Sequence, residues 1–498
     1  MSVLIAGNVT VEKLVQDDSR DNNRKADPPV ATKPVAESLG HAWTIRLSGD
    51  FPLATCGTLD QLSPRGTFLN TGASDRTVTW AQATGLHQNR PVQEPDVVII
   101  GSGIAGGALA TVLADGGLHV LILERQLHYR DQVRGEILWP WGVRLARALG
   151  VERVLLNAGA HFVPRLDLYD EGAAERLRFE VGEAVSGIEG SLNIHHPRAC
   201  SAFADAASSL GADARKGVSD VRLETGKQNL VRWTERDGGA HEAHCRLIVG
   251  ADGRRSSVRS QARIELEIDP PAQLVAGMLV DNVEGVDDEV NVMAREADLI
   301  FYSFPQQGGR SRLYLCFPTG QESRFAGAGG PQRFLDTCRL DCLAGVADWP
   351  AARPTGPCAT FPGEDSRVSR PLVDGVVLIG DAAGYENPLQ GQGLSMAMQD
   401  VQDVSEALLS AGPSEIDFEE YAERRAIRKR LADLGTLLEV WTNEGCVVQD
   451  PEERAARNTF IEGDELLTAL QMCFMTGFDS LPQDLTHADL VDRLAAYG

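Results

Sequence analysis

The sequence lacks the features of a disulfide-bonded, membrane-spanning or nucleic-acid-binding protein. Its nine cysteines are scattered, odd in number and free of any Cys-x-x-Cys pair, which argues against a disulfide framework or a metal site. No apolar run approaches the roughly 18 residues that a membrane span needs. Basic residues number 47 against 71 acidic ones, so the chain lacks the basic face that binds nucleic acid. We therefore expect a reduced, cytoplasmic protein with no metal, no membrane span and no nucleic-acid partner.

The most informative segment that is present runs from Val97 to Arg125. An apolar stretch leads into Gly101-x-Gly103-x-x-Gly106, followed by a small-residue helix pattern and a second apolar stretch that ends in Glu124. This order is typical of a βαβ unit that binds a dinucleotide, because the glycines allow a tight turn and bring the pyrophosphate close to a helix N-terminus. The Glu124 carboxylate is placed to accept hydrogen bonds from a ribose.

A second predicted strand, in residues 247–259 (LIVGADGRRSSVR), ends in Asp252-Gly253. Between the two segments, Arg134 stands shortly before a predicted helix, in the stretch VRGEILWPWGV. A guanidinium group is a natural bidentate partner for a diphosphate, although it can equally form a surface salt bridge.

A third segment, residues 378–400, contains a strand that ends in Gly380-Asp381 and a glycine-rich turn that opens a helix. Asp381 is placed to accept hydrogen bonds from a polyol chain. Free N–H groups at the positive end of the following helix, near Gly391, would stabilise the negative charge of a reduced flavin. The sequence therefore predicts three separate turns that together could hold one flavin dinucleotide.

Together these segments resemble the flavoprotein monooxygenases of the para-hydroxybenzoate hydroxylase family over roughly residues 95–410. The resemblance implies noncovalently bound FAD and surrounds its isoalloxazine ring with Pro388, Gly393 and Leu394, without a single catalytic acid or base. The cofactor contacts that it implies are Gly101, Gly103, Gly106, Glu124, Arg125, Arg134, Arg198, Asp252, Gly253, Gly380, Asp381 and Gly391.

The resemblance also implies an activity that depends on NADH or NADPH and on O2. A flavin hydroperoxide would hydroxylate or epoxidise a bound small organic molecule, and the protein would have to exclude water from it. Tyr385, Glu386 and Gln392 depart from the family pattern beside the expected flavin face, which argues against a phenolic acid substrate. The candidate walls of the substrate pocket are aromatic residues that could equally be core: Trp139, Phe301, Tyr302, Tyr314 and Phe317.

Three alternatives stay open. A flavin-dependent halogenase also carries paired tryptophans, which Trp139-Pro140-Trp141 resembles, but Gly142-Val143 stands where that family has isoleucine-proline. An isoprenoid double-bond reductase has a similar FAD domain. A non-catalytic FAD-binding sensor or interaction protein is disfavoured by the ring-binding turn, because a scaffold has no need to stabilise reduced flavin. Substrate, electron donor and oligomeric state are not determined.

The predicted fold class is α/β, with a Rossmann-like FAD-binding domain interleaved with a β-sheet substrate domain. A helical region follows these domains, and an N-terminal extension of unknown role precedes them. The expected boundaries, in chain order, are the extension at 1–94, FAD-binding parts at 95–165, 192–264 and 364–410, a substrate-domain hairpin at 166–191, the main substrate sheet at 265–363, and the helical region at 411–498.

Overall fold

A computed structural model describes the backbone of three N-terminal strands and most of the chain from residue 94 to residue 497; positions 134, 227, 411–416, 444, 445, 447 and 449 lie outside the description. The N-terminal strands β1 (Ser2–Ile5), β2 (Val9–Leu14) and β3 (Ala42–Leu47) pair antiparallel in that order. The remainder of the predicted extension lies outside the described residues.

A six-stranded, mostly parallel sheet forms the first layer, in the order β11-β5-β4-β15-β25-β24. Its central strands are buried at every position, as apolar strands covered on both faces should be. They are β4 (Val97–Ile100), β5 (Val120–Glu124), β15 (Leu247–Gly250) and β25 (Val376–Leu378), flanked by the edge strands β11 (Asp213–Lys216) and β24 (Leu372–Val373).

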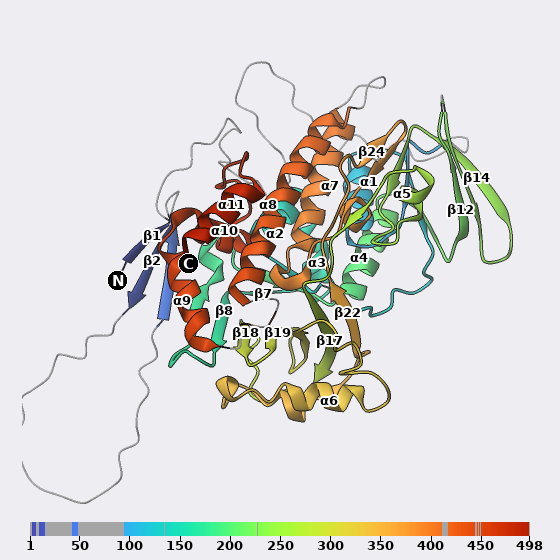
Figure 1. The fold of residues 1–498 in the computed structure, drawn as a ribbon. Helices are drawn as coiled ribbons and strands as arrows, with labels where there is room; N and C mark the ends of the chain where they lie inside the picture. Colours follow the sequence, from blue (N-terminus) through green and yellow to red (C-terminus); the bar gives the residue numbers. More distant parts are fainter. Residues whose placement is uncertain are drawn as a thin grey trace, which may run out of the picture.

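The two faces of this sheet pack against different partners. Val97 and Ile99 belong to the core formed with three helices, whereas Val98 and Ile100 face a small antiparallel sheet, because side chains alternate along a strand. The helices are α1 (Ile104–Asp115), α4 (His196–Ser209) and α7 (Gly393–Ser410), and the small sheet is β12 (Ser219–Glu224), β13 (Asn229–Thr234) and β14 (Ala240–Cys245), which projects at one edge of the molecule (Figure 1).

A second large sheet has the order β21-β17-β20-β19-β18-β8-β9, and β22 pairs with β17 outside this path. β8 and β18 pair parallel although Leu168 and Met293 come from distant parts of the chain. The strands are β8 (Arg165–Asp170), β9 (Leu177–Glu180), β17 (Gln273–Asp281), β18 (Val290–Glu296), β19 (Leu299–Pro305), β20 (Ser311–Phe317), β21 (Arg353–Pro354) and β22 (Ala359–Gly363).

Shorter elements complete the fold. They are a three-stranded sheet of β6 (Ile137–Leu138), β7 (His161–Val163) and β10 (Ser191–Asn193), the β16–β23 pair (Glu267–Ile268 and Ser366–Arg367), and the helices α2 (Pro140–Ala148), α3 (Glu152–Asn157), α5 (Ser257–Gln261) and α6 (Gly330–Thr337). This arrangement confirms the predicted α/β fold class.

The C-terminal part is helical, as predicted. α8 runs beside α7 through the middle of the molecule, and the later helices gather at one side (Figure 1). These helices are α8 (Glu419–Asn443), α9 (Pro451–Glu462), α10 (Glu465–Thr476) and α11 (His487–Leu494). In the described part of the chain, no helix combines the length and the apolar character of a membrane span. The eight cysteines described are free thiols.

Candidate functional site

The turn between β4 and α1 depends on two glycines that leave no room for a side chain. Gly101 has a φ of +98°, and a Cβ placed on it would lie 2.4 Å from the carbonyl oxygen of Ala251 at the end of β15. A Cβ on Gly106 would lie 2.0 Å from the carbonyl oxygen of Gly101. These contacts pack α1 tightly against the carboxyl ends of β4 and β15.

Gly103 has a different environment, because no atom lies within 4 Å of its Cβ position. It precedes the first residue of α1, and no side chain caps that helix. The free N–H groups of the helix N-terminus therefore face open space, which is the arrangement that binds a phosphate group.

Glu124, at the end of β5, lies directly beside this turn. Its buried carboxylate accepts hydrogen bonds from the backbone N–H of Ser102 at 2.8 Å and of Gln126 at 2.7 Å. A carboxylate has about four lone-pair positions, so these two bonds leave capacity for hydroxyl donors.

Asp252 approaches the same turn through its backbone. Its Cα lies 2.8 Å from the Cβ position of Gly101, but its carboxylate accepts hydrogen bonds from the backbone N–H groups of Ser257 and Val258 at 2.6 and 3.2 Å. The side chain thus stabilises the start of α5. The next residue, Gly253, has a φ of +79°.

The strand β25 ends in a turn that lies against the start of α1. Gly380 has a φ of +57°, and its Cβ position is 3.0 Å from the Cβ of Ala105. Its N–H donates to Asp400 at 2.8 Å, which ties the turn to α7. Asp381 follows within the 3-10 turn η5 (Gly380–Ala383) and is partly exposed. The ends of β4, β15 and β25 therefore meet at one edge of the parallel sheet, where open α/β sheets bind ligands.

A second helix N-terminus lies beyond this turn. Asn387 accepts a hydrogen bond from the N–H of Leu389 at 3.1 Å and so caps the 3-10 turn η6 (Pro388–Gln390). Gly391 follows with a φ of +65°, and α7 begins at Gly393, whose Cβ position has no atom within 4 Å. The side chain of Leu394 lies next to Gly135.

Two residues that were candidate pocket walls hold this turn by hydrogen bonds. The indole N–H of Trp139 donates to the carbonyl of Gln390 at 2.8 Å. The Tyr302 hydroxyl donates to the carbonyl of Leu389 at 2.9 Å. Both side chains are buried.

The large sheet separates the other candidate pocket residues between its two faces. Tyr302 and Tyr314 belong to the core shared with α7 and α8, and the Phe304 ring packs against both of them. Phe301 and Phe317 point to the opposite face, where they pack against Trp349 and Phe325 in the core that includes residues of α6. They do not share a face with the two tyrosines.

Sequence reasoning missed a buried charged network beside Tyr314. The Tyr314 hydroxyl donates to Glu136 at 2.6 Å, and the fully buried Arg312 lies 2.9 Å from Glu136 and 2.7 Å from Asp131. Burial raises the pKa of Glu136 to about 7. Burial acts in the same direction on Asp131, but hydrogen bonds from His195 and Arg312 outweigh it and lower the pKa of that carboxyl. The detectable signal was a single arginine inside the apolar strand β20.

Two arginines of the predicted cofactor set line surface grooves that share Leu127 and His128. Arg125 borders a groove of about 790 Å³ with His128 and Arg236, and Arg198 borders one of about 550 Å³ with His128 and Lys216. Arg134, the remaining arginine of that set, lies outside the described residues.

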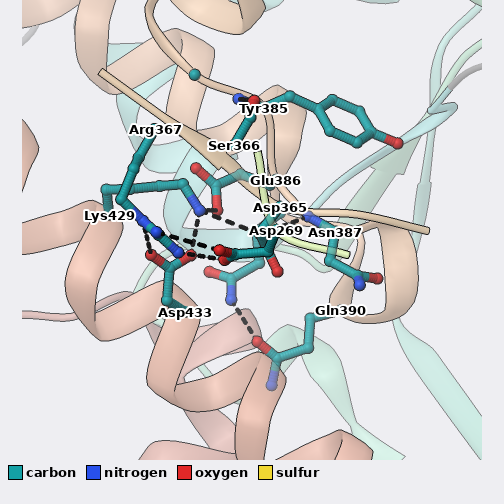
Figure 2. Close-up of polar contacts among 12 residues, drawn as sticks. Asp269, Asp365, Ser366, Arg367, Tyr385, Glu386, Asn387, Gln390, Lys429 and Asp433 are labelled. Carbon is teal, nitrogen blue, oxygen red and sulfur yellow. Dashed lines mark hydrogen bonds and ion pairs between the residues drawn. The ribbon is translucent and has the colours of Figure 1, made fainter. Parts of the chain in front are cut away.

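A cluster of carboxylates lies beneath the 385–391 turn, although the sequence predicted no metal site. Asp365, Glu386 and Asp433 bring their oxygens within 4.8 Å of one another, and the Lys429 ammonium group lies among them (Figure 2). The lysine therefore supplies the positive charge that these carboxylates need.

Comparison with known proteins assigns the chain to a family. Residues 94–431 match the family described as FAD binding domain. A squalene monooxygenase of Panax ginseng, SE1, is 26% identical over 312 residues, which span 61% of this chain and 57% of that protein. Digeranylgeranylglycerophospholipid reductase 1 of Methanopyrus kandleri is 26% identical over 324 residues, 61% of this chain and 78% of that protein.

A solved structure shows the same fold. The structure of pqsL from Pseudomonas aeruginosa, described as a probable FAD-dependent monooxygenase, matches with a TM-score of 0.60 and 22% identity over 74% of this chain and 100% of that one. The fold and the converging turns thus define a dinucleotide-binding α/β protein. Since the family match covers well over half of the chain, the protein belongs to the FAD binding domain family, and the resemblance to FAD-dependent monooxygenases is confirmed.

Proposed function

We propose that the protein is a flavin monooxygenase that uses NADH or NADPH and O2 to hydroxylate or epoxidise a small organic molecule. The observation that carries this proposal is the convergence of the Gly101–Gly106 turn, the Gly380–Gly393 segment and the face of the large sheet that holds Tyr302. This convergence supports a dinucleotide site beside a buried aromatic surface.

The two helix N-termini, at Gly103 and at Gly393, support one orientation of FAD. The N-terminus of α1 at Gly103 would hold the pyrophosphate and Glu124 the adenosine ribose, where open space and a carboxylate with spare lone pairs are available. Asp381 would contact the ribityl chain. The isoalloxazine ring would then lie at Pro388, Gly393 and Leu394, where the second helix N-terminus has no atom near its Gly393 Cβ position.

The remaining predicted cofactor residues take secondary roles. Arg125 and Arg198 would contact the adenosine end from the two grooves that they line. Gly101, Gly106, Gly380 and Gly391 set the turns, and Asp252-Gly253 contributes backbone, because the Asp252 carboxylate is occupied by α5.

FAD, when bound, supplies the redox chemistry: it accepts hydride from a reduced pyridine nucleotide and activates O2 for oxygen transfer. The chain has to orient the substrate and exclude water. The hydrogen bonds from Trp139 and Tyr302 hold the 389–391 turn rigid, and the aromatic face of Tyr302, Phe304 and Tyr314 offers an apolar surface that keeps water out.

The named activity of the Panax ginseng relative supports an apolar, alkene-bearing substrate over a phenolic acid. A second candidate, reduction of an isoprenoid double bond, is favoured by the similarity to the Methanopyrus kandleri reductase. The match covers 78% of that reductase but 57% of the Panax ginseng monooxygenase.

The deciding measurement is the flavin absorbance of the purified protein, followed anaerobically as NADH and then NADPH are added. We expect one nucleotide to bleach the flavin and air to restore the absorbance. Under air and with an alkene, an oxygenated product would support monooxygenation, whereas a saturated product formed without O2 would support the reductase. Bound flavin that neither nucleotide bleaches would contradict the proposed function.

A further inference from the structure

α8 follows the segment that leads from β25 to the flavin-binding turn. Three of its buried side chains, spaced four residues apart on one face, reach this segment. The Tyr421 hydroxyl donates to the carbonyl of Leu378 at 2.7 Å. The Arg425 guanidinium donates to the carbonyls of Gly380 and Gly384 at 3.4 and 3.2 Å.

Lys429 is the third of these side chains, and it reaches the residues directly before η6. Its ammonium group lies 3.1 Å from Asp365 Oδ1 and 3.3 Å from Glu386 Oε2, and it also contacts Asp433 (Figure 2). Asp365 Oδ1 in turn accepts the backbone N–H of Asn387 at 2.9 Å. Lys429 thereby holds Glu386 by a direct ion pair and Asn387 through Asp365.

The charges around Glu386 are unbalanced without Lys429. α8 presents Lys429, Arg425 and Asp433 to it, and the chain before β23 presents Asp365. Arg367 of β23 pairs with Asp433 and with the partly exposed Asp269 (Figure 2). Burial raises the pKa of Glu386 to about 8. Removal of the lysine charge would leave the buried carboxyl groups of Asp365 and Glu386 facing each other and the partly exposed Asp433, which is costly.

We propose that Lys429 is a positioning residue for the flavin ring: its ammonium group ties Glu386 and Asp365 to α8 and so holds residues 385–391 against the start of α7. This inference rests on the proposed placement of the ring at Pro388, Gly393 and Leu394. If α8 holds this turn, the N-terminus of α7 stays directed at the flavin ring. The positive end of that helix then stabilises the negative charge of the reduced flavin.

The test compares K429M, which removes the charge from a side chain of similar length, with K429R and with K429M/E386Q. R424M is the matched control, since Arg424 is another α8 cation but is half exposed and pairs with Glu420 and Asp403. The readouts are the dissociation constant of FAD from the apoprotein and the midpoint potential of the bound flavin.

We expect K429M to weaken FAD binding about tenfold. The loss should be larger for reduced FAD, and a further tenfold difference between the two forms lowers a two-electron midpoint potential by about 30 mV. K429R should restore most of the affinity, and E386Q should restore part of it because it removes one excess carboxylate. R424M should match the wild type.

Wild-type affinity and potential in K429M, an equal loss in R424M, or no rescue by K429R would each overturn the inference. If K429M does not fold, E386Q alone decides: it should flatten the change of FAD affinity with pH between about pH 7 and 9, and a wild-type pH profile would overturn the inference. A wild-type chain that binds no FAD would overturn the proposed function as well, which distinguishes the two failures.

Discussion

At the scale of single residues, the β4–α1 turn sets opposite requirements at two glycines. Gly106 is in contact with the backbone of Gly101, so a methyl group there must displace the chain. Gly103 has space around its Cβ position and an ordinary φ of −75°. Its lack of a side chain is therefore not needed for folding, and the space it leaves suits a ligand.

This contrast predicts different outcomes for two alanine substitutions. Gly106→Ala should lower the free energy of unfolding of the apoprotein by about 1–3 kcal/mol, because the turn is overpacked. Gly103→Ala should leave the apoprotein stability unchanged within about 0.5 kcal/mol but weaken FAD binding. Thermal unfolding and FAD titration of both variants check this. A Gly103→Ala protein with wild-type affinity would argue against a pyrophosphate at this helix end.

At the scale of elements, the pairing of α7 with α8 depends on a buried ion pair. Arg425 Nε lies 3.1 Å from Asp400 Oδ2, and both side chains are almost fully buried. Asp400 also accepts the Gly380 N–H at 2.8 Å. The packing of two helices is thereby coupled to the turn that carries Asp381.

We therefore expect Arg425→Met to lower the free energy of unfolding by about 3 kcal/mol, because the buried Asp400 would lose its nearer cation and keep only Arg428, whose Nη2 lies 3.5 Å from Asp400 Oδ1. The double variant D400N/R425M should recover part of this loss. Arg424→Met on the same helix should cost less than about 1 kcal/mol, since that side chain is half exposed. Chemical denaturation of the three variants measures these differences, and equal effects at positions 424 and 425 would contradict the argument.

At the scale of the whole molecule, the two large sheets are interleaved along the chain. The chain leaves the parallel sheet after β5, adds β8 and β9 to the second sheet, and returns through α4 to β11. It leaves again after β15 for β17–β22 and returns at β24 and β25. We propose that the five predicted segments between residues 95 and 410 build two domains that cannot unfold independently.

Calorimetry of the apoprotein should accordingly show one transition for the two sheets. FAD at a hundredfold excess over its dissociation constant should add about 2.7 kcal/mol of stability and shift this transition as a unit. Two transitions, of which FAD moves one, would show that the sheets unfold as separate domains.

The sequence by itself determined the features that depend on local backbone geometry. The glycines at 101, 106 and 380 occur where positive φ or close backbone contact excludes a side chain. The strands that lead into these turns are short apolar runs, which a covered parallel sheet requires. These constraints act within a few residues, so a pattern of residue types is enough to reveal them.

Only the tertiary structure decided which side chains meet across the molecule. Alternation along β19 and β20 shows that Phe301 and Tyr302 face opposite ways, but not which face lies toward the predicted ring site. Arg425 and Lys429 likewise resemble surface residues in the sequence, and Arg312, although it stands in an apolar strand, does not reveal its partners there. Their burial depends on carboxylates from distant segments, such as Glu136, Asp400 and Asp365, that compensate their charge only in the folded chain.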